Sequence, residues 1–156
     1  MVTARGIRPR TLVAIALTVG VPAVMLLRLT GGALGPLSPG GWAGVVVLVF
    51  MAAGVVAAGL PVQRLRDGKS ATPISPLRAA RTLVLAQSSA LAGAALCGWY
   101  AAHAVALVPD LDVDSQKARL WLVLTHIVAA VVLGLAGMIT QRRCRLDDPP
   151  PREDVA

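Results

Sequence analysis

Charged residues, aromatic residues and cysteine are all scarce in this 156-residue chain, and each scarcity excludes a class of protein. Only 15% of the residues are charged, against about 25% in an ordinary soluble domain, and the mean hydropathy is +0.70. Aromatic residues make up 3%, too few for a base-stacking surface, so the net charge of +7 does not indicate nucleic-acid binding. The two cysteines show no metal-ligand spacing and predict no disulfide framework.

Four long apolar runs, by contrast, contain no Asp, Glu, Lys or Arg. A bilayer core of about 30 Å is crossed by about 20 apolar residues in a helix, and lipid offers no hydrogen bonds to an exposed backbone. The sequence therefore predicts an all-α fold, a four-transmembrane-helix bundle that forms one membrane domain over residues 11–141. The expected spans are about 11–27, 42–62, 82–108 and 120–141.

The segments that flank this domain are short and charged. Residues 1–10 form a basic tail, and residues 142–156 form a charged, Pro-rich tail that we expect to be disordered. The first apolar run has an alternative interpretation as a cleaved signal peptide. Its 17 residues exceed the usual apolar core of such a peptide, and no A-x-A cleavage site follows it, so a retained helix is favoured.

Lys and Arg are distributed unevenly around the four runs. Twelve of the 15 lie in the two tails and the second connection, and the other two connections share three. Because short cytoplasmic segments are enriched in Lys and Arg, we predict that both termini are cytoplasmic and that this side faces anionic lipid headgroups. The residues expected to anchor the helices at the lipid interface are Trp42, Trp99, Tyr100, Trp121, Arg142, Arg143 and Arg145.

The third run contains the stretch LAQSSALAGAALCGWYAAHA, Leu85 to Ala104, which mixes small and polar residues without any fixed charge. Placed on a helix at about 100° per residue, its small residues form one stripe. Spacing of four between small residues lets two helix backbones approach closely in a membrane. We therefore predict a helix-packing seam made of Ala86, Ser89, Ala90, Gly93, Cys97 and Ala101.

Gln87, Thr125 and His126 are the candidate polar residues inside the membrane. The amide of Gln87 needs partners in hydrocarbon, either through a hydrogen bond between helices or by lining a cavity that opens to the cytoplasm. His126 is either a neutral, hydrogen-bonded side chain or a proton relay. No carboxylate lies in the membrane to accompany such a relay.

Catalytic patterns are missing from the sequence. It has no paired carboxylates, no Walker loop and no HExxH motif, and the acidic run from Asp110 to Asp114 is too short for a calcium-binding loop. The serines of the third run lie near the opposite membrane side from the two histidines, so no nucleophile has a base beside it. We therefore predict no enzyme, no catalytic residue, no cofactor and no metal.

Four segments resemble one known family. They are RPRTLVAIAL (Arg8 to Leu17), the turn GGALGPLSP, the stretch PLRAARTLVLAQSSALAGAALCGWYAA (Pro76 to Ala102) and RRCRLDDPPP near the end of the chain. Together they resemble the small actinobacterial membrane proteins grouped as domain of unknown function 3180. The resemblance implies a multi-pass protein of the bacterial plasma membrane with no assigned activity, often encoded near genes of folate biosynthesis.

Two functions remain open on the sequence. The first is a non-enzymatic accessory or scaffold subunit that packs against a protein partner or forms a homo-oligomer. The alternative is an oligomeric transporter for small solutes, which the resemblance suggests would be folate-related. The transporter requires Gln87, Thr125 and His126 to line one path.

Overall fold

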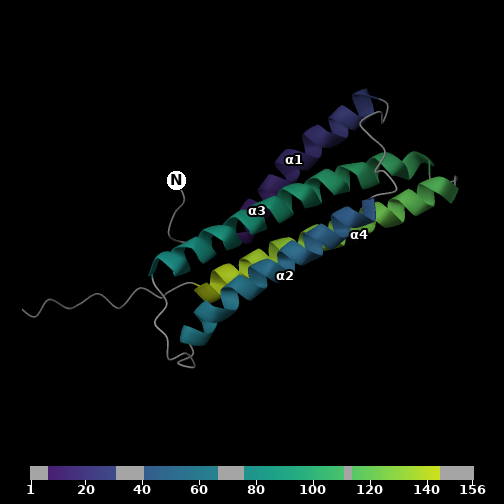
Figure 1. Cartoon of the computed structure of the whole chain (residues 1–156). Coiled ribbons are helices and arrows are strands. Elements are labelled where there is room, and N and C mark those ends of the chain that lie inside the picture. The colour runs from purple at the N-terminus through teal and green to yellow at the C-terminus, as the bar shows by residue number, and fades with distance from the viewer. Residues whose placement is uncertain (1–6, 31–40, 67–75, 111–113, 145–156) are drawn as a thin grey trace, which may run out of the picture.

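The structure, a computed structural model, describes residues 7–30, 41–66, 76–110 and 114–144, and nearly all of them are helical. The prediction of an all-α protein with four helices is confirmed (Figure 1). By length and composition, each of the four α-helices is able to span a membrane. The elements are α1 (Pro9–Leu29), α2 (Gly41–Arg66), α3 (Pro76–Leu107), the 3-10 helix η1 (Val108–Asp110) and α4 (Asp114–Cys144).

The helices extend beyond the apolar runs because their ends suit a helix. Proline is the first residue of both α1 and α3, where its missing N–H would have no helical partner. α4 begins at Asp114, whose carboxylate is favourable near the positive end of the helix dipole. The ammonium of Lys117 lies 2.7 Å from that carboxylate, which further supports the first turn.

The four helices stand in the order α1, α3, α4, α2 rather than in the order of the chain (Figure 1). Within the described residues, α3 and α4 share the most extensive contact and run antiparallel. α1 packs on α3, whereas α2 packs on α4 and touches α3 only slightly. α1 and α2 therefore flank a central pair, although they are consecutive in the sequence.

Clusters of buried apolar residues join α2 to α4 and α1 to α3. The contact between α2 and α4 is built on Leu48, Ala52 and Leu133. The contact between α1 and α3 is built on Leu12 and Ala94 near one end, with a second cluster near the other. Alanine is frequent in these clusters because the helices approach closely.

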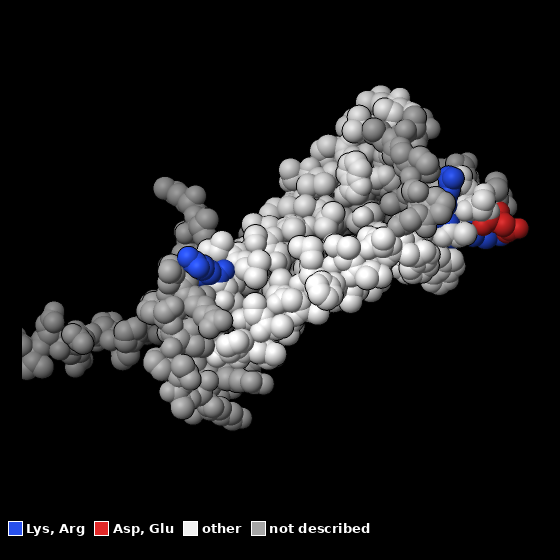
Figure 2. Space-filling model, in the orientation of Figure 1, with Lys and Arg blue, Asp and Glu red and all other residues white. Residues whose placement is uncertain are grey.

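Charge lies only at the two ends of the described bundle (Figure 2). We call the end where α1 begins and α4 ends the basic end; it carries Arg8, Arg10, Arg81 and Arg142. At the far end, α1 finishes and α4 begins, and acidic and basic residues are mixed. The uncharged surface between the two ends matches a protein that crosses a membrane several times.

Candidate functional site

The backbones of α3 and α4 approach each other closely at two glycines. A Cβ atom at Gly93 would lie 2.6 Å from the backbone nitrogen of Gly134 and 2.8 Å from the carbonyl oxygen of Ala130. A Cβ atom at Gly137 would lie 2.6 Å from the carbonyl oxygen of Ala86. Real Cβ atoms do not come that close to backbone, so only glycine at these positions lets the two helices meet at this distance.

The structure brings only part of the predicted seam into this contact. Ala86, Ala90 and Gly93 are buried against α4, and buried Ser89 donates a hydrogen bond of 2.8 Å to the carbonyl of Leu85 in its own helix. Cys97 and Ala101 lie outside this contact: both are half-buried and line grooves. Beyond Gly93, Gly98 meets α1, while Tyr100 continues the contact with α4 at His126.

Gly98 controls the approach of α1 and was missed from the sequence. A Cβ atom there would collide with the backbone carbonyl of Ala16, and one at Gly20 would lie 3.1 Å from the carbonyl oxygen of Gly98. The signal was present, since Gly98 is a small residue in the same stretch. It lies 100° around the helix from the stripe that we singled out.

His126 is a packing residue at the junction of α2, α3 and α4. Its side chain is 1% exposed, and Nδ1 donates to the carbonyl oxygen of Leu122 at 2.8 Å, since a carbonyl only accepts. Its ring centroid lies 4.6 Å from that of Tyr100. On the other side, a Cβ atom at Gly44 would lie 2.8 Å from His126 Nε2, so the imidazole rests directly on the backbone of α2.

The three polar candidates do not meet. Tyr100 marks the level of His126, and Gln87 lies 13 residues earlier in the same helix, which is about 20 Å along the axis. Thr125 is half-buried, donates to the carbonyl of Leu122 at 2.7 Å and lines a shallow groove between α2 and α4. Gln87 is half-buried near the basic end and does not line the groove that Thr125 borders.

We predict that His126 acts through its volume. His126→Ala, which leaves a cavity, is expected to lower the free energy of unfolding by about 2–4 kcal/mol. His126→Leu refills much of the volume and should recover more than half of that loss. Thr125→Val, which removes a hydroxyl bonded within its own helix, should change stability by about 0.6 kcal/mol or less. Equal losses for the Ala and Leu variants, in unfolding from detergent micelles, would contradict the packing role.

The expected interface anchors divide into two groups. Trp42 and Trp121 are 60% and 71% exposed near the far end. Trp99 and Tyr100 instead turn inward: Trp99 packs on the α1–α3 cluster and against the ring of His103 at 5.0 Å. Arg142 is exposed at the basic end. Arg145 and the side chain of Arg143 lie outside the described residues.

Two buried polar residues near the basic end were also missed from the sequence. Thr140 is 2% exposed, and its hydroxyl lies 3.5 Å from the carbonyl oxygen of Val55 on α2. Gln141 is 5% exposed, and its Nε2 lies 3.5 Å from the carbonyl oxygen of Ile7, just before α1. Sequence reasoning passed over both because they stand next to the arginines, where polar residues are ordinarily solvated.

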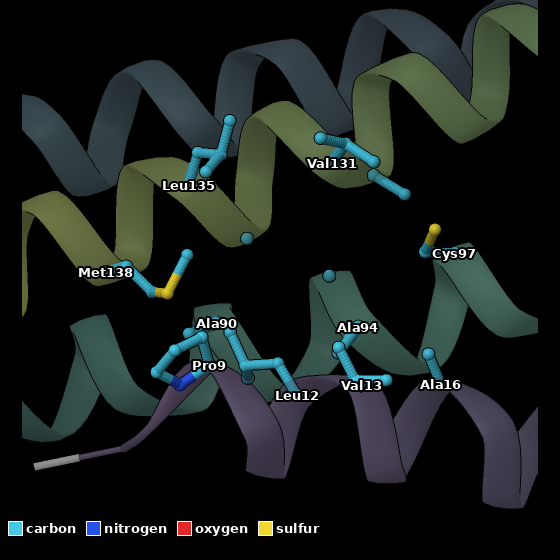
Figure 3. A pocket seen from close by; sticks show the side chains of 13 residues that line it. Pro9, Leu12, Val13, Ala16, Ala90, Ala94, Cys97, Val131, Leu135 and Met138 are labelled. Atoms are coloured by element: carbon cyan, nitrogen blue, oxygen red, sulfur yellow. The ribbon is translucent and has the colours of Figure 1, made fainter.

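An apolar groove follows α1 in two halves. The half nearer the basic end has a volume of about 280 Å³ and lies between α1 and α4 over a floor of α3. Figure 3 shows Val131, Leu135 and Met138 on the α4 side and Leu12, Val13 and Ala16 on the α1 side. The far half, about 410 Å³, lies between α1 and α3. Ala16 and Cys97 line both halves, so the two meet near the middle of the bundle.

The described part of the chain was searched for groups of side chains that could bind a metal ion. There, no group of three His, Cys, Asp or Glu side chains lies close enough to hold an ion. The hydroxyls of Ser88 and Ser89 bond to their own helix, and neither contacts a histidine. These two serines thus serve their own helix, and the apolar groove is a feature able to receive another molecule.

Comparison with known proteins gives one match. The model of the family described as protein of unknown function (DUF3180) matches residues 12–148. A search of curated proteins and a search of solved structures each gave no match. The family supplies no activity, so a function has to be argued from the geometry.

Proposed function

We propose that this chain, which belongs to the family described as protein of unknown function (DUF3180), is a non-enzymatic accessory or scaffold subunit. It is a multi-pass helical membrane protein. In our proposal it resides in the plasma membrane of a bacterium, with both termini cytoplasmic. The basic end then faces anionic lipid headgroups on the cytoplasmic side. The bundle holds a protein partner within the membrane.

The observation that carries the proposal is the one-sided attachment of α1. Only 11% of its most apolar 18 residues are buried inside the bundle, against 50% for α4. Val13, Leu17, Val21 and Met25, four residues apart, are 57–64% exposed along a single face. This face borders the groove, so a helix that packs there contacts α1 and α3 together.

The far half of the groove suits the side chains of a partner helix. Its floor carries Cys97, Gly98, Ala101 and Ala102, which are all small, and its lining is apolar throughout. Helices associate in membranes through close packing on small residues, because lipid gives them no hydrophobic driving force. Bulky side chains from a partner would fill the hollow between α1 and α3.

The transporter alternative has weaker support. It needs Gln87, Thr125 and His126 on one path, and Gln87 lies about 20 Å along the bundle from the other two. His126 is enclosed by packing, and Thr125 bonds to its own helix. No observation on these residues favours solute movement.

The proposal is tested by filling the groove and measuring partner retention. The full chain is tagged, extracted in mild detergent and analysed by quantitative mass spectrometry. Ala101→Leu is expected to lower the co-purified partner at least about tenfold, as a clash of about 1.4 kcal/mol or more would. Ala53→Leu, on the exposed surface of α2, should leave it unchanged. Crosslinking through Cys97 should join the same partner.

Two further variants separate the scaffold from the alternative. Gln87→Leu and His126→Leu should both retain the partner if the subunit acts by packing. Loss of solute uptake with either change, together with a homo-oligomer that carries no companion, would contradict the scaffold and support transport. Equal retention by Ala101→Leu and Ala53→Leu would exclude the groove as the docking surface.

A further inference from the structure

The basic half of the groove differs from the far half in what stands at its mouth. Its walls are apolar down to the middle of the bundle, where it meets Cys97. Its lining begins at Pro9, which lies between two exposed arginines, Arg8 and Arg10. On the α4 side the lining includes Met138, one turn before Gln141, and exposed Arg142 follows. A hollow suited to hydrocarbon therefore opens beside positive charge from two helices.

The first turn of α1 adds a further positive element. Arg8 is the N-cap residue and makes no capping bond with its side chain, and no acidic residue stands in the first turn. The N-terminus of a helix of this length carries unsatisfied N–H groups and about half a unit of positive charge. Pro9 has no N–H and the N–H of Thr11 already donates to the carbonyl of Arg8 at 2.9 Å, so an anion here is attracted by the positive end of the helix dipole and by the two arginines.

Gln141 supplies an independent indication of a ligand. Its Nε2 is directed at the carbonyl of Ile7, two residues before α1 begins, at 3.5 Å. Its Oε1 is buried and has no hydrogen-bond partner among the residues that the structure describes. A buried amide oxygen without a donor is unfavourable, so a hydroxyl or N–H group of a bound molecule would be stabilised by donating to it.

We propose that the basic half of the groove binds one anionic phospholipid whose headgroup bears a hydroxyl. The phosphate lies at the N-terminus of α1, between the guanidinium groups of Arg8 and Arg10. The headgroup hydroxyl donates to Oε1 of Gln141. One acyl chain lies in the groove between α1 and α4.

The apolar groove, the positive charge at the N-terminus of α1 and the buried amide oxygen of Gln141 together favour an anionic phospholipid. A free phosphate would leave the apolar hollow empty, and a neutral lipid would leave the arginines and the helix N-terminus without a counter-charge. A partner helix would bring backbone and side chains, but no phosphate, to the helix N-terminus. The inference goes beyond the proposed function, because it concerns the other half of the groove and needs no protein partner.

The test uses the purified full chain in neutral detergent and lipids of defined headgroup. Native mass spectrometry measures the affinity for phosphatidylglycerol, for phosphatidylmethanol, which has the same charge but no hydroxyl, and for phosphatidylcholine. The wild-type chain should bind one phosphatidylglycerol molecule, with a preference of about two- to tenfold over phosphatidylmethanol, as one hydrogen bond provides. It should bind phosphatidylcholine at least about tenfold more weakly still, because a zwitterion gives no net counter-charge.

Variants assign each part of the lipid to its residues. Arg8→Gln combined with Arg10→Gln should weaken phosphatidylglycerol about thirtyfold, at roughly fivefold per basic residue. Arg81→Gln removes a charge at the same end but outside the groove and should weaken it at most about fivefold. Gln141→Met should abolish the preference over phosphatidylmethanol. Because that readout is a ratio within one protein, it does not depend on the variant's stability.

A groove-filling pair completes the experiment. Val131→Phe, from the exposed wall on α4, should weaken all bound lipids, and Val46→Phe on the exposed face of α2 should weaken none. Equal binding of phosphatidylcholine and phosphatidylglycerol would overturn the proposal. So would an Arg81→Gln effect as large as that of the double variant, or lipid binding that survives Val131→Phe unchanged. None of these outcomes bears on Ala101→Leu, which tests the far half of the groove.

Discussion

Gly93→Val is expected to lower the free energy of unfolding by about 3 kcal/mol or more, because it inserts a branched side chain into backbone. The first atom of that side chain would already lie 2.6 Å from the nitrogen of Gly134. A rotamer change gives no relief, since the obstacle is the main chain of α4. The α3–α4 contact, the most extensive among the described helices, has to separate along its length.

Gly54 offers the matched control for this prediction. It lies on the exposed side of α2, and a Cβ atom there would meet nothing within 4 Å. Gly54→Val should therefore change stability by about 0.5 kcal/mol or less. Both variants are unfolded reversibly in mixed micelles while helix content is followed by circular dichroism. Similar midpoints would show that α3 and α4 do not touch through Gly93.

Gly98→Val is expected to detach α1 while the other three helices stay together. A Cβ atom at Gly98 collides with the carbonyl of Ala16, and within the described residues α1 has no comparable contact with α2 or α4. Loss of this one contact leaves α1 with only lipid around it. The remaining row of α3, α4 and α2 retains its own clusters, so the effect is local.

Crosslinking reports this selectivity directly. In a chain whose two cysteines are replaced by serine, Leu12→Cys with Ala94→Cys joins α1 to α3, since both residues lie in one cluster. Leu48→Cys with Leu133→Cys joins α2 to α4 in the same way. Gly98→Val should reduce the first crosslink at least about tenfold and leave the second unchanged. Loss of both would mean that α1 supports the whole bundle.

The sequence was sufficient to predict where the four helices lie in the chain, but not which helices pack against each other. Long runs without charge define membrane helices because an unpaired backbone is excluded from lipid, and this reasoning placed all four. No pattern in these runs predicts that α1 packs beside α3. Spacing within a helix identifies a face, but the helix that covers the face depends on contacts between segments far apart in the chain.

The candidate site shows the same limit. The small stripe around Ala90 and Gly93 was identified from spacing, and the structure places it on α4. Its continuation at Cys97 lies in the lining of the grooves, and Gly98 makes the close approach to α1 at that level. His126 was recognised as polar but not as enclosed, since the residues that enclose it, Gly44 and Tyr100, come from two other helices.

The order of the four helices in the row has a consequence for the insertion of the protein into the membrane. A membrane protein is delivered to the bilayer from its first helix onward, and α1 and α2 are delivered before anything they pack against exists. Their surfaces are complementary to α3 and α4, which come last and form the antiparallel hairpin at the centre of the row. α1 and α2 therefore reach their final positions only after α3 and α4 have entered the membrane and paired.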